Sequence, residues 1–183
     1  MLDTLTKPTT VDMKSRQLPL RERYTEMPSA ALISDHATTR CDRVRPNQPL
    51  YGEIEFGDIN RTRLPISLHQ GVGGQSDLPV PGELFCAAIA SCLDSTIRVI
   101  ANMFGLAIET LEVHVEADVD LRGTLRMDPN VQTAFQQINV AVNLVSVNEV
   151  PKDHIDAIIA AAEHSCVVLQ SLRTPPRISV ERT

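Results

Sequence analysis

The four cysteines of this chain, Cys41, Cys86, Cys92 and Cys166, are the residues with the most distinctive chemistry. Cys92 and Cys166 each lie in a long apolar stretch of helical character, where side chains are expected to be buried. A thiol pair shielded from water suits two-step peroxide chemistry. One thiolate attacks the O–O bond and becomes a sulfenic acid, and the other thiol condenses with it to a disulfide. The attacking thiol must be deprotonated, so a nearby cation is expected.

Two other roles for the cysteines compete with this one. Buried cysteine is common as a small core residue, and on the residues alone two inert thiols are the simpler interpretation. Zinc binding is disfavoured because the sequence has no CxxC, no HxxxH and no paired Cys and His cluster. We therefore expect neither a metal nor a cofactor.

Residues 81–105 predict the central helix, which positions Cys92. Pro81 suits the first helical position, and Gly105 suits the left-handed residue just after a helix end. The residues between them are mostly small or aliphatic, so the helix is expected to be buried on nearly all sides. Six residues of helix turn a side chain by about 600°, so Cys86 and Cys92 point about 120° apart. At most one of them belongs to a given site.

The remaining elements follow from hydrophobic periodicity. Alternating residues predict half-buried strands over 111–121 and 138–144, and a second helix from Pro151 to Leu172 carries Cys166 on its apolar stripe. Shorter strands are predicted at 37–44, 50–56, 64–68 and 177–180. The order is strands, helix, strands, helix, strand, with connections typical of antiparallel sheets. This order predicts the α+β class.

Length and charge limit the function classes. The 183 residues predict one domain over 30–183, preceded by a polar arm at 1–29 that is either disordered or laid on a partner subunit. A net charge of −6 and 3% aromatic residues argue against a nucleic-acid partner. We expect no membrane span and no signal peptide, hence a cytoplasmic, reducing location that favours free thiols. The apolar central helix needs more cover than one chain supplies, which predicts a homodimer.

Several motifs together resemble one known family. They are PGEL at 81–84, ASCL around Cys92, AEHSCV around Cys166 and the glycine-rich segment 71–74. The chain from about residue 35 to its end resembles the osmotically induced protein C and organic hydroperoxide resistance (OsmC/Ohr) family. The resemblance implies an OsmC-like fold, in which antiparallel sheets surround two central helices in an intertwined homodimer. It also implies thiol-dependent reduction of organic hydroperoxides at the subunit interface.

The resemblance assigns roles to two of the thiols. Cys92 matches the peroxidatic position and Cys166 the resolving position, whereas Cys41 and Cys86 match neither. Reducing equivalents would come from a dithiol, such as dihydrolipoyl groups, or from other thiols. The alternative is a dimer of the same fold that senses redox state or binds small molecules without efficient peroxidase activity.

The chain departs from the family pattern at the polar site residues. Arg45 is the best match to the arginine that stabilises the thiolate, with Arg43 close behind. The family carboxylate lies ten residues before the peroxidatic cysteine, where this chain has Gly82; Glu83 lies nine before it. Glu83 therefore either reaches the site through an irregular first helical turn or only occupies the helix start.

Overall fold

Two antiparallel sheets contain the strands of residues 11–182, the part of the chain that this computed structural model describes. The three-stranded sheet has the order β1–β2–β3, and β4 and β5 form a long hairpin. The strands are β1 (Ala37–Thr39), β2 (Tyr51–Phe56), β3 (Thr62–Ser67), β4 (Ile108–Val119) and β5 (Phe135–Ser146). Small antiparallel sheets combined with helices confirm the α+β class.

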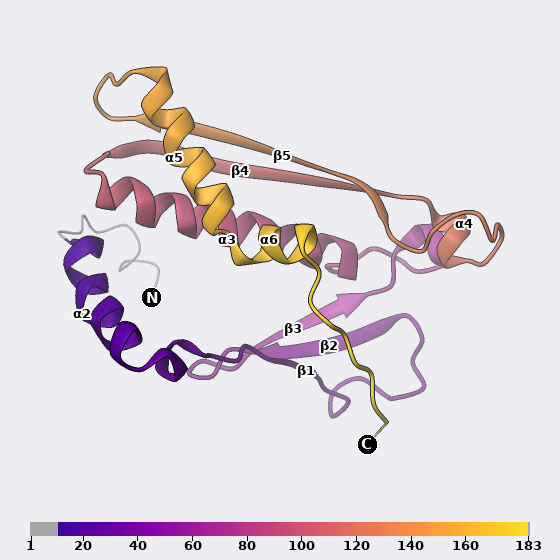
Figure 1. The fold of residues 1–183 in the computed structure, drawn as a ribbon. Helices are drawn as coiled ribbons and strands as arrows, with labels where there is room; N and C mark the ends of the chain where they lie inside the picture. The colour runs from indigo at the N-terminus through magenta and orange to yellow at the C-terminus, as the bar shows by residue number, and fades with distance from the viewer. Residues whose placement is uncertain (1–10, 183) are drawn as a thin grey trace.

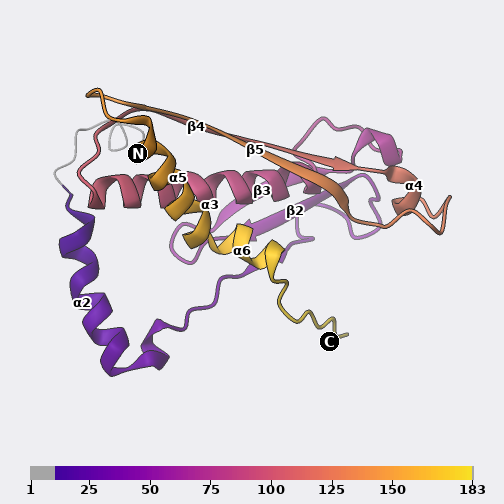
Figure 2. The ribbon, with the colours of Figure 1, turned by 45° about the horizontal axis from the view of Figure 1, so that its top comes forward.

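The helices gather between and beside these sheets. They are α2 (Met13–Glu26), α3 (Pro81–Met103), α4 (Leu121–Thr124), α5 (Lys152–Ser165) and α6 (Val167–Arg173), with 3₁₀ turns η1 (Pro28–Ala31) and η2 (Gln70–Val72). In Figure 1 the long helix α3 runs along the β4–β5 hairpin, and α5 crosses α3. Figure 2 shows the three-stranded sheet on the side of α3 away from the hairpin.

The predicted ends of α3 are confirmed. Pro81 lies in the first turn, where the Glu83 carboxylate accepts a hydrogen bond of 3.0 Å from the backbone N–H of Val80. This bond satisfies a donor that the helix itself leaves free. Gly105 has a φ of +72° directly after the Phe104 cap, the left-handed conformation that glycine adopts at low cost.

A tight turn delivers the chain to α3. Gly73 has a φ of +90°, and a Cβ atom added at Gly74 would collide with the carbonyl oxygen of Leu68. Larger residues are therefore disfavoured at both positions. The glycines of the 71–74 segment thus serve the backbone path before the helix.

One stripe of α3 forms the centre of the core. Its buried residues recur every fourth position: Ile89, Leu93, Ile97 and Ala101. They face nearly one direction because a four-residue step is only slightly more than one helical turn of about 3.6 residues. From Leu93 to Ala101 the stripe packs with Ile158 and Ala162 of α5, and alternate side chains of the hairpin cover it. The expectation that α3 is buried on nearly all sides therefore does not hold within one chain, which buries only this stripe.

The apolar character of α3 also changes one prediction from the sequence. An 18-residue window of this helix has a mean hydropathy of 1.7, which meets the length and composition of a membrane span. The prediction that no stretch of the chain is long and apolar enough to span a membrane is therefore wrong by length and composition. A core helix meets the same criterion, and the α3 stripe packs against β4 and α5, although only 22% of the window is buried within one chain.

The predicted second helix is broken rather than continuous. It ends at Ser165 and resumes at Val167 after a bend of 67°. Cys166 between them has extended backbone angles, φ −76° and ψ 105°. The prediction of one helix from Pro151 to Leu172 is therefore wrong at Cys166, which joins two helices instead of lying within one.

The two ends of the chain also differ from expectation. Residues 177–180 form no strand, and Ile178 and Val180 are 80% and 93% exposed. A strand needs a neighbour for its backbone groups, and the described part of one chain provides none there. In the arm, α2 forms a helix that starts at the Asp12 cap and is tied to α3 through Asn102. Residues 1–10 lie outside the described part of the chain, and the domain boundary at residue 30 stays a prediction.

We predict that Ile97→Ala lowers the free energy of unfolding by about 2–5 kcal/mol, because it leaves a cavity in the fully buried stripe. Urea unfolding followed by circular dichroism measures this change. Ile59→Ala is the control, since Ile59 is 94% exposed in a turn and the change there should stay within about 0.5 kcal/mol. Equal losses in both variants would contradict the assignment of the core.

Candidate active site

The structure brings Cys92 and Cys166 together at the core. Cys92 lies on α3, half-buried, and packs against the core cluster to which Cys166 belongs. Cys166 is fully buried at the junction of α5 and α6. The Cys92 side chain is close enough to Cys166 to raise the pKa of the Cys166 thiol. Two distant parts of the sequence thus place their cysteine side chains near each other at the core.

Local backbone contacts fix each of the two cysteines. The hydroxyl groups of Ser95 and Thr96 donate to the Cys92 carbonyl at 3.1 and 2.7 Å. The Cys166 carbonyl accepts the N–H of Gln170 at 2.9 Å, which makes Cys166 the residue from which α6 starts. Cys92 is therefore held within a regular helix, whereas Cys166 is held at a helix boundary.

Cys166 is the more deeply buried of the two thiols. This burial is the main reason why the pKa of Cys166 is raised above its ordinary value of 9.0, and the neighbouring Cys92 raises that pKa further. Backbone N–H groups of Leu169 and Val168 act in the opposite direction without cancelling the rise. Cys166 is consequently a protonated thiol at neutral pH. It suits the donor and resolving role better than the role of attacking thiolate.

The other predicted site residues lie elsewhere in the single chain. Arg45 is exposed in the loop between β1 and β2, and Arg43 pairs with the buried Glu53 at 3.4 Å. The Glu83 carboxylate accepts a hydrogen bond at the start of α3. At 1.5 Å per residue, Glu83 lies about 13 Å from Cys92 along the helix axis. The structure therefore brings together the two predicted thiols, but not Arg45 or Glu83 with them.

The remaining two cysteines do not join the pair. Cys86 is half-buried on α3, and Cys41 is exposed beside the three-stranded sheet. All four cysteines are free thiols. Across residues 11–182, no group of three or more His, Cys, Asp or Glu side chains is placed to hold a metal ion.

Sequence reasoning missed a group of polar residues beside Cys166. Arg173 forms an ion pair with Glu163, and the Gln170 side-chain amide donates to the Glu163 carbonyl at 2.9 Å. On the continuous helix that the sequence predicts, residues 163 and 173 would lie about 15 Å apart along the axis. The bend at Cys166 brings them into contact, so residue spacing gave no signal for this pair.

Comparison with known proteins identifies the family. A family model described as OsmC-like protein matches residues 74–181, which is more than half of the chain. This chain belongs to the OsmC-like family. The match contains both Cys92 and Cys166 of the OsmC-like chain, whereas Arg45 lies before it. The resemblance stated from the motifs is thus confirmed.

Solved structures similar to the OsmC-like chain share its fold at low identity. An organic hydroperoxide resistance protein OsmC from Legionella pneumophila has 22% identity and a TM-score of 0.56, with 78% of this chain and 91% of that chain covered. An OsmC-like protein of unknown function from Vibrio cholerae has 14% identity, a TM-score of 0.61, and coverage of 76% and 94%. An OsmC-like protein from Mycoplasma pneumoniae has 12% identity, a TM-score of 0.58, and coverage of 78% and 89%. A search of curated proteins gave no match.

The raised pKa of Cys166 predicts a pH-dependent stability of the OsmC-like chain. As pH rises past 9.0, the unfolded state loses this proton before the folded state does. The stabilising contribution is therefore complete below that pH and declines as pH approaches the raised value. Urea unfolding between pH 7 and 10 should show a steeper alkaline loss for the native protein than for Cys166→Val, which has no titrating thiol. Parallel pH profiles would contradict the assignment.

Proposed function

We propose that this chain is a thiol-dependent peroxidase that reduces organic hydroperoxides, with Cys92 as the attacking thiol and Cys166 as the resolving thiol. The observation that carries the proposal is the contact between a half-buried thiol on α3 and a fully buried, protonated thiol at the α5–α6 junction. Membership of the OsmC-like family supports it, as do the names of similar structures, which include organic hydroperoxide resistance proteins.

The first step uses the Cys92 thiolate. Its sulfur attacks the distal oxygen of ROOH, the O–O bond breaks, and a proton goes to the departing alkoxide to give ROH. Sulfur is oxidised to the sulfenic acid Cys92–SOH, and the peroxide is reduced to the alcohol. The apolar residues that pack around the pair, such as Leu93, favour an organic group over a small polar peroxide at this place.

The second step uses the Cys166 thiol. Its sulfur attacks the sulfenic sulfur, the S–O bond breaks, and Cys92–S–S–Cys166 and water are formed. The thiol proton leaves with the hydroxyl oxygen, so no external oxidant is needed. An external dithiol then exchanges with the disulfide, which returns both cysteines to thiols and leaves the dithiol oxidised. The cycle requires no metal and no cofactor.

A homodimer is part of the proposal. A single chain leaves much of the apolar helix α3 uncovered, and Ile178 and Val180 near the C-terminus are exposed. A second copy covering these groups would remove apolar surface from water. It would also allow the loop between β1 and β2 to bring Arg45 to the thiol of the other copy, where a cation would favour the Cys92 thiolate. In the same proposal the Glu83 carboxylate accepts its hydrogen bond at the start of α3.

The second candidate function is that of a redox-sensing or small-molecule-binding dimer of the OsmC-like fold, without efficient peroxidase activity. The observation that favours it is the position of Arg45 on an exposed loop and of Glu83 at the start of α3, where its carboxylate bonds the backbone. A cytoplasmic, reducing location fits both candidates, since both need the cysteines as free thiols.

We predict that one equivalent of tert-butyl hydroperoxide forms an intramolecular Cys92–Cys166 disulfide, detected by peptide mass spectrometry. Cys92→Ser should abolish the reaction, because no sulfenic acid forms. Cys166→Ser should leave a Cys92 sulfenic acid that over-oxidises or couples to an outside thiol. Cys86→Ala is the matched control on the same helix and should keep turnover, since its sulfur points about 120° away from that of Cys92. Unreacted thiols in a folded protein would favour the second candidate.

We predict a dimer in solution because the uncovered apolar surface of α3 and of the C-terminal segment is costly to expose. Sedimentation velocity at micromolar concentration should give a species of about twice the chain mass of 20.1 kDa. A single species at the chain mass would exclude the shared site and leave Arg45 without a route to Cys92.

A further inference from the structure

The bend at Cys166 is spanned by side chains from both helices. Glu163 lies near the end of α5, and Gln170 and Arg173 lie on α6. Arg173 forms an ion pair with the Glu163 carboxylate, while the Gln170 amide donates to the Glu163 carbonyl at 2.9 Å. That same carbonyl accepts the N–H of Cys166 at 3.4 Å. Glu163 therefore holds α6 through its side chain and its backbone, and it also contacts the backbone of the buried cysteine.

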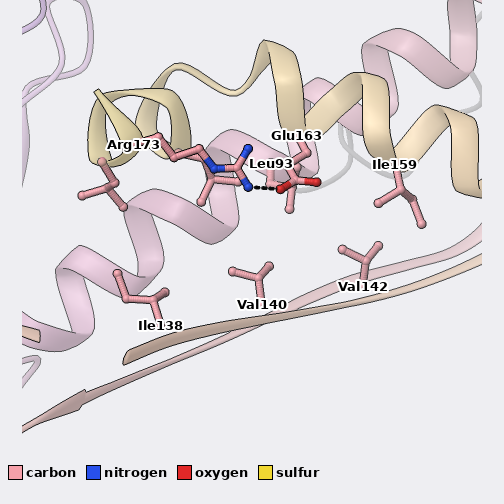
Figure 3. Close-up of a pocket in the computed structure, with 9 residues that line it drawn as sticks. Leu93, Ile138, Val140, Val142, Ile159, Glu163 and Arg173 are labelled. Atoms are coloured by element: carbon pink, nitrogen blue, oxygen red, sulfur yellow. Dashed lines mark hydrogen bonds and ion pairs between the residues drawn. The ribbon is translucent and has the colours of Figure 1, made fainter. Parts of the chain in front are cut away.

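A cavity lies under this contact. Its volume is about 420 Å³, and its lining comes from α3, β5, α5 and α6: Leu93, Ile138, Val140, Val142, Ile159, Glu163, Leu169, Leu172 and Arg173. In Figure 3 the Glu163 and Arg173 side chains point toward each other above the valines of β5. Close packing does not hold α6 on this side, because the space beneath it is open. The angle of the bend then depends more strongly on the polar contacts that span it.

The angle of α6 matters for the buried sulfur. The extended backbone of Cys166 is what joins α5 to α6, so a swing of α6 changes the torsion angles at Cys166 and with them the direction of its side chain. The backbone N–H groups of Val168 and Leu169, in the first turn of α6, also act on the Cys166 sulfur. A displaced α6 would move these donors and the sulfur away from Cys92 together.

We propose that Glu163, Gln170 and Arg173 form a latch that positions the Cys166 sulfur toward Cys92 and thereby sets how readily their disulfide forms. The latch rests on the proposed function for its role in turnover. Its effect on the thiol pair can be measured without any peroxide. None of its residues touches the peroxide; they act through Cys166 and are positioning residues.

The expected size of the effect follows from the exposure of the pair. The side chains of Glu163 and Arg173 are 42% and 58% exposed, and exposed ion pairs contribute little to overall stability. We expect Arg173→Met to lower the equilibrium constant for the Cys92–Cys166 disulfide by about fivefold, which equals about 1 kcal/mol at tenfold per 1.4 kcal/mol. Methionine keeps an apolar stem against the cavity, so the melting temperature should change little.

The test uses a glutathione redox buffer. Oxidised glutathione and the protein dithiol exchange to give the protein disulfide and two molecules of reduced glutathione. Alkylation and peptide mass spectrometry of the full chain then give the fraction of Cys92–Cys166 disulfide. The measurements are made with Cys41→Ser in every variant, because the exposed Cys41 would itself bind glutathione. Glu163→Gln should lower the equilibrium constant as Arg173→Met does, since each removes the same ion pair.

Arg122→Met is the matched control. Arg122 also forms an ion pair, with Asp120, and its side chain is likewise 58% exposed, but it lies at α4 rather than at the bend. This variant should leave the equilibrium constant unchanged. The exchanged pair Glu163→Arg with Arg173→Glu should recover most of the loss, because opposite charges again span the bend. An Arg173→Met value within twofold of the native value, or a loss equal to that of Arg122→Met, would overturn the latch.

Failure of the latch and failure of the proposed function give different results. If the glutathione assay gives the expected loss in Arg173→Met but the native protein forms no disulfide with tert-butyl hydroperoxide, the peroxidase proposal fails and the latch stands. In the converse case, hydroperoxide forms the disulfide equally fast in the native protein and in Arg173→Met, and the latch alone fails. If both hold, trapping of Cys92–SOH with dimedone should show unchanged sulfenic acid formation in Arg173→Met and slower loss to the disulfide.

Discussion

The packing of one α3 stripe against α5 is the constraint on which the rest of the structure depends. Every fourth residue of α3, from Ile89 to Ala101, turns toward the core, and Ile158 and Ala162 of α5 meet this stripe. The same contact decides where the sulfurs lie, since Cys92 is next to Leu93 on α3 and Cys166 ends α5. Forming the core thus brings together the two helices that carry the thiols, and the proposed latch then sets the direction of the Cys166 side chain.

Burial by this core gives the two sulfurs different chemistry. Cys166 lies wholly inside, where charge is poorly solvated, and its pKa is raised. Cys92 lies at the edge of the same cluster, half-buried, where a substrate could reach it. A symmetric pair would leave open which sulfur attacks. The depth of the two side chains alone supports the order of reaction that we propose, with Cys92 first and Cys166 second.

Sequence reasoning succeeded where local chemistry decides the structure. Pro81 and Gly105 mark the two ends of α3, and the alternation along β4 puts Leu111 and Val113 toward the core and Glu112 toward solvent. It failed where tertiary contacts decide. The segment around Cys166 has neither proline nor glycine at the bend, so its sequence looks like a continuous helix. The bend goes with tertiary contacts that the sequence does not reveal: Leu169 of α6 packs against the core, and the Glu163–Arg173 ion pair spans the bend.

The uncovered side of α3 bears directly on whether the pair is a working site. Ala88, Ser91 and Ser95 are exposed on this helix beside Cys92, and side chains this small permit close approach of another backbone. A second copy packed there would seal Cys92 from water and could place the loop that carries Arg45 near its sulfur. Burial alone would raise the pKa of any cysteine so covered, so the cation must arrive with the cover. In this proposal dimerisation and activation of Cys92 are one event, because the same surface supplies both.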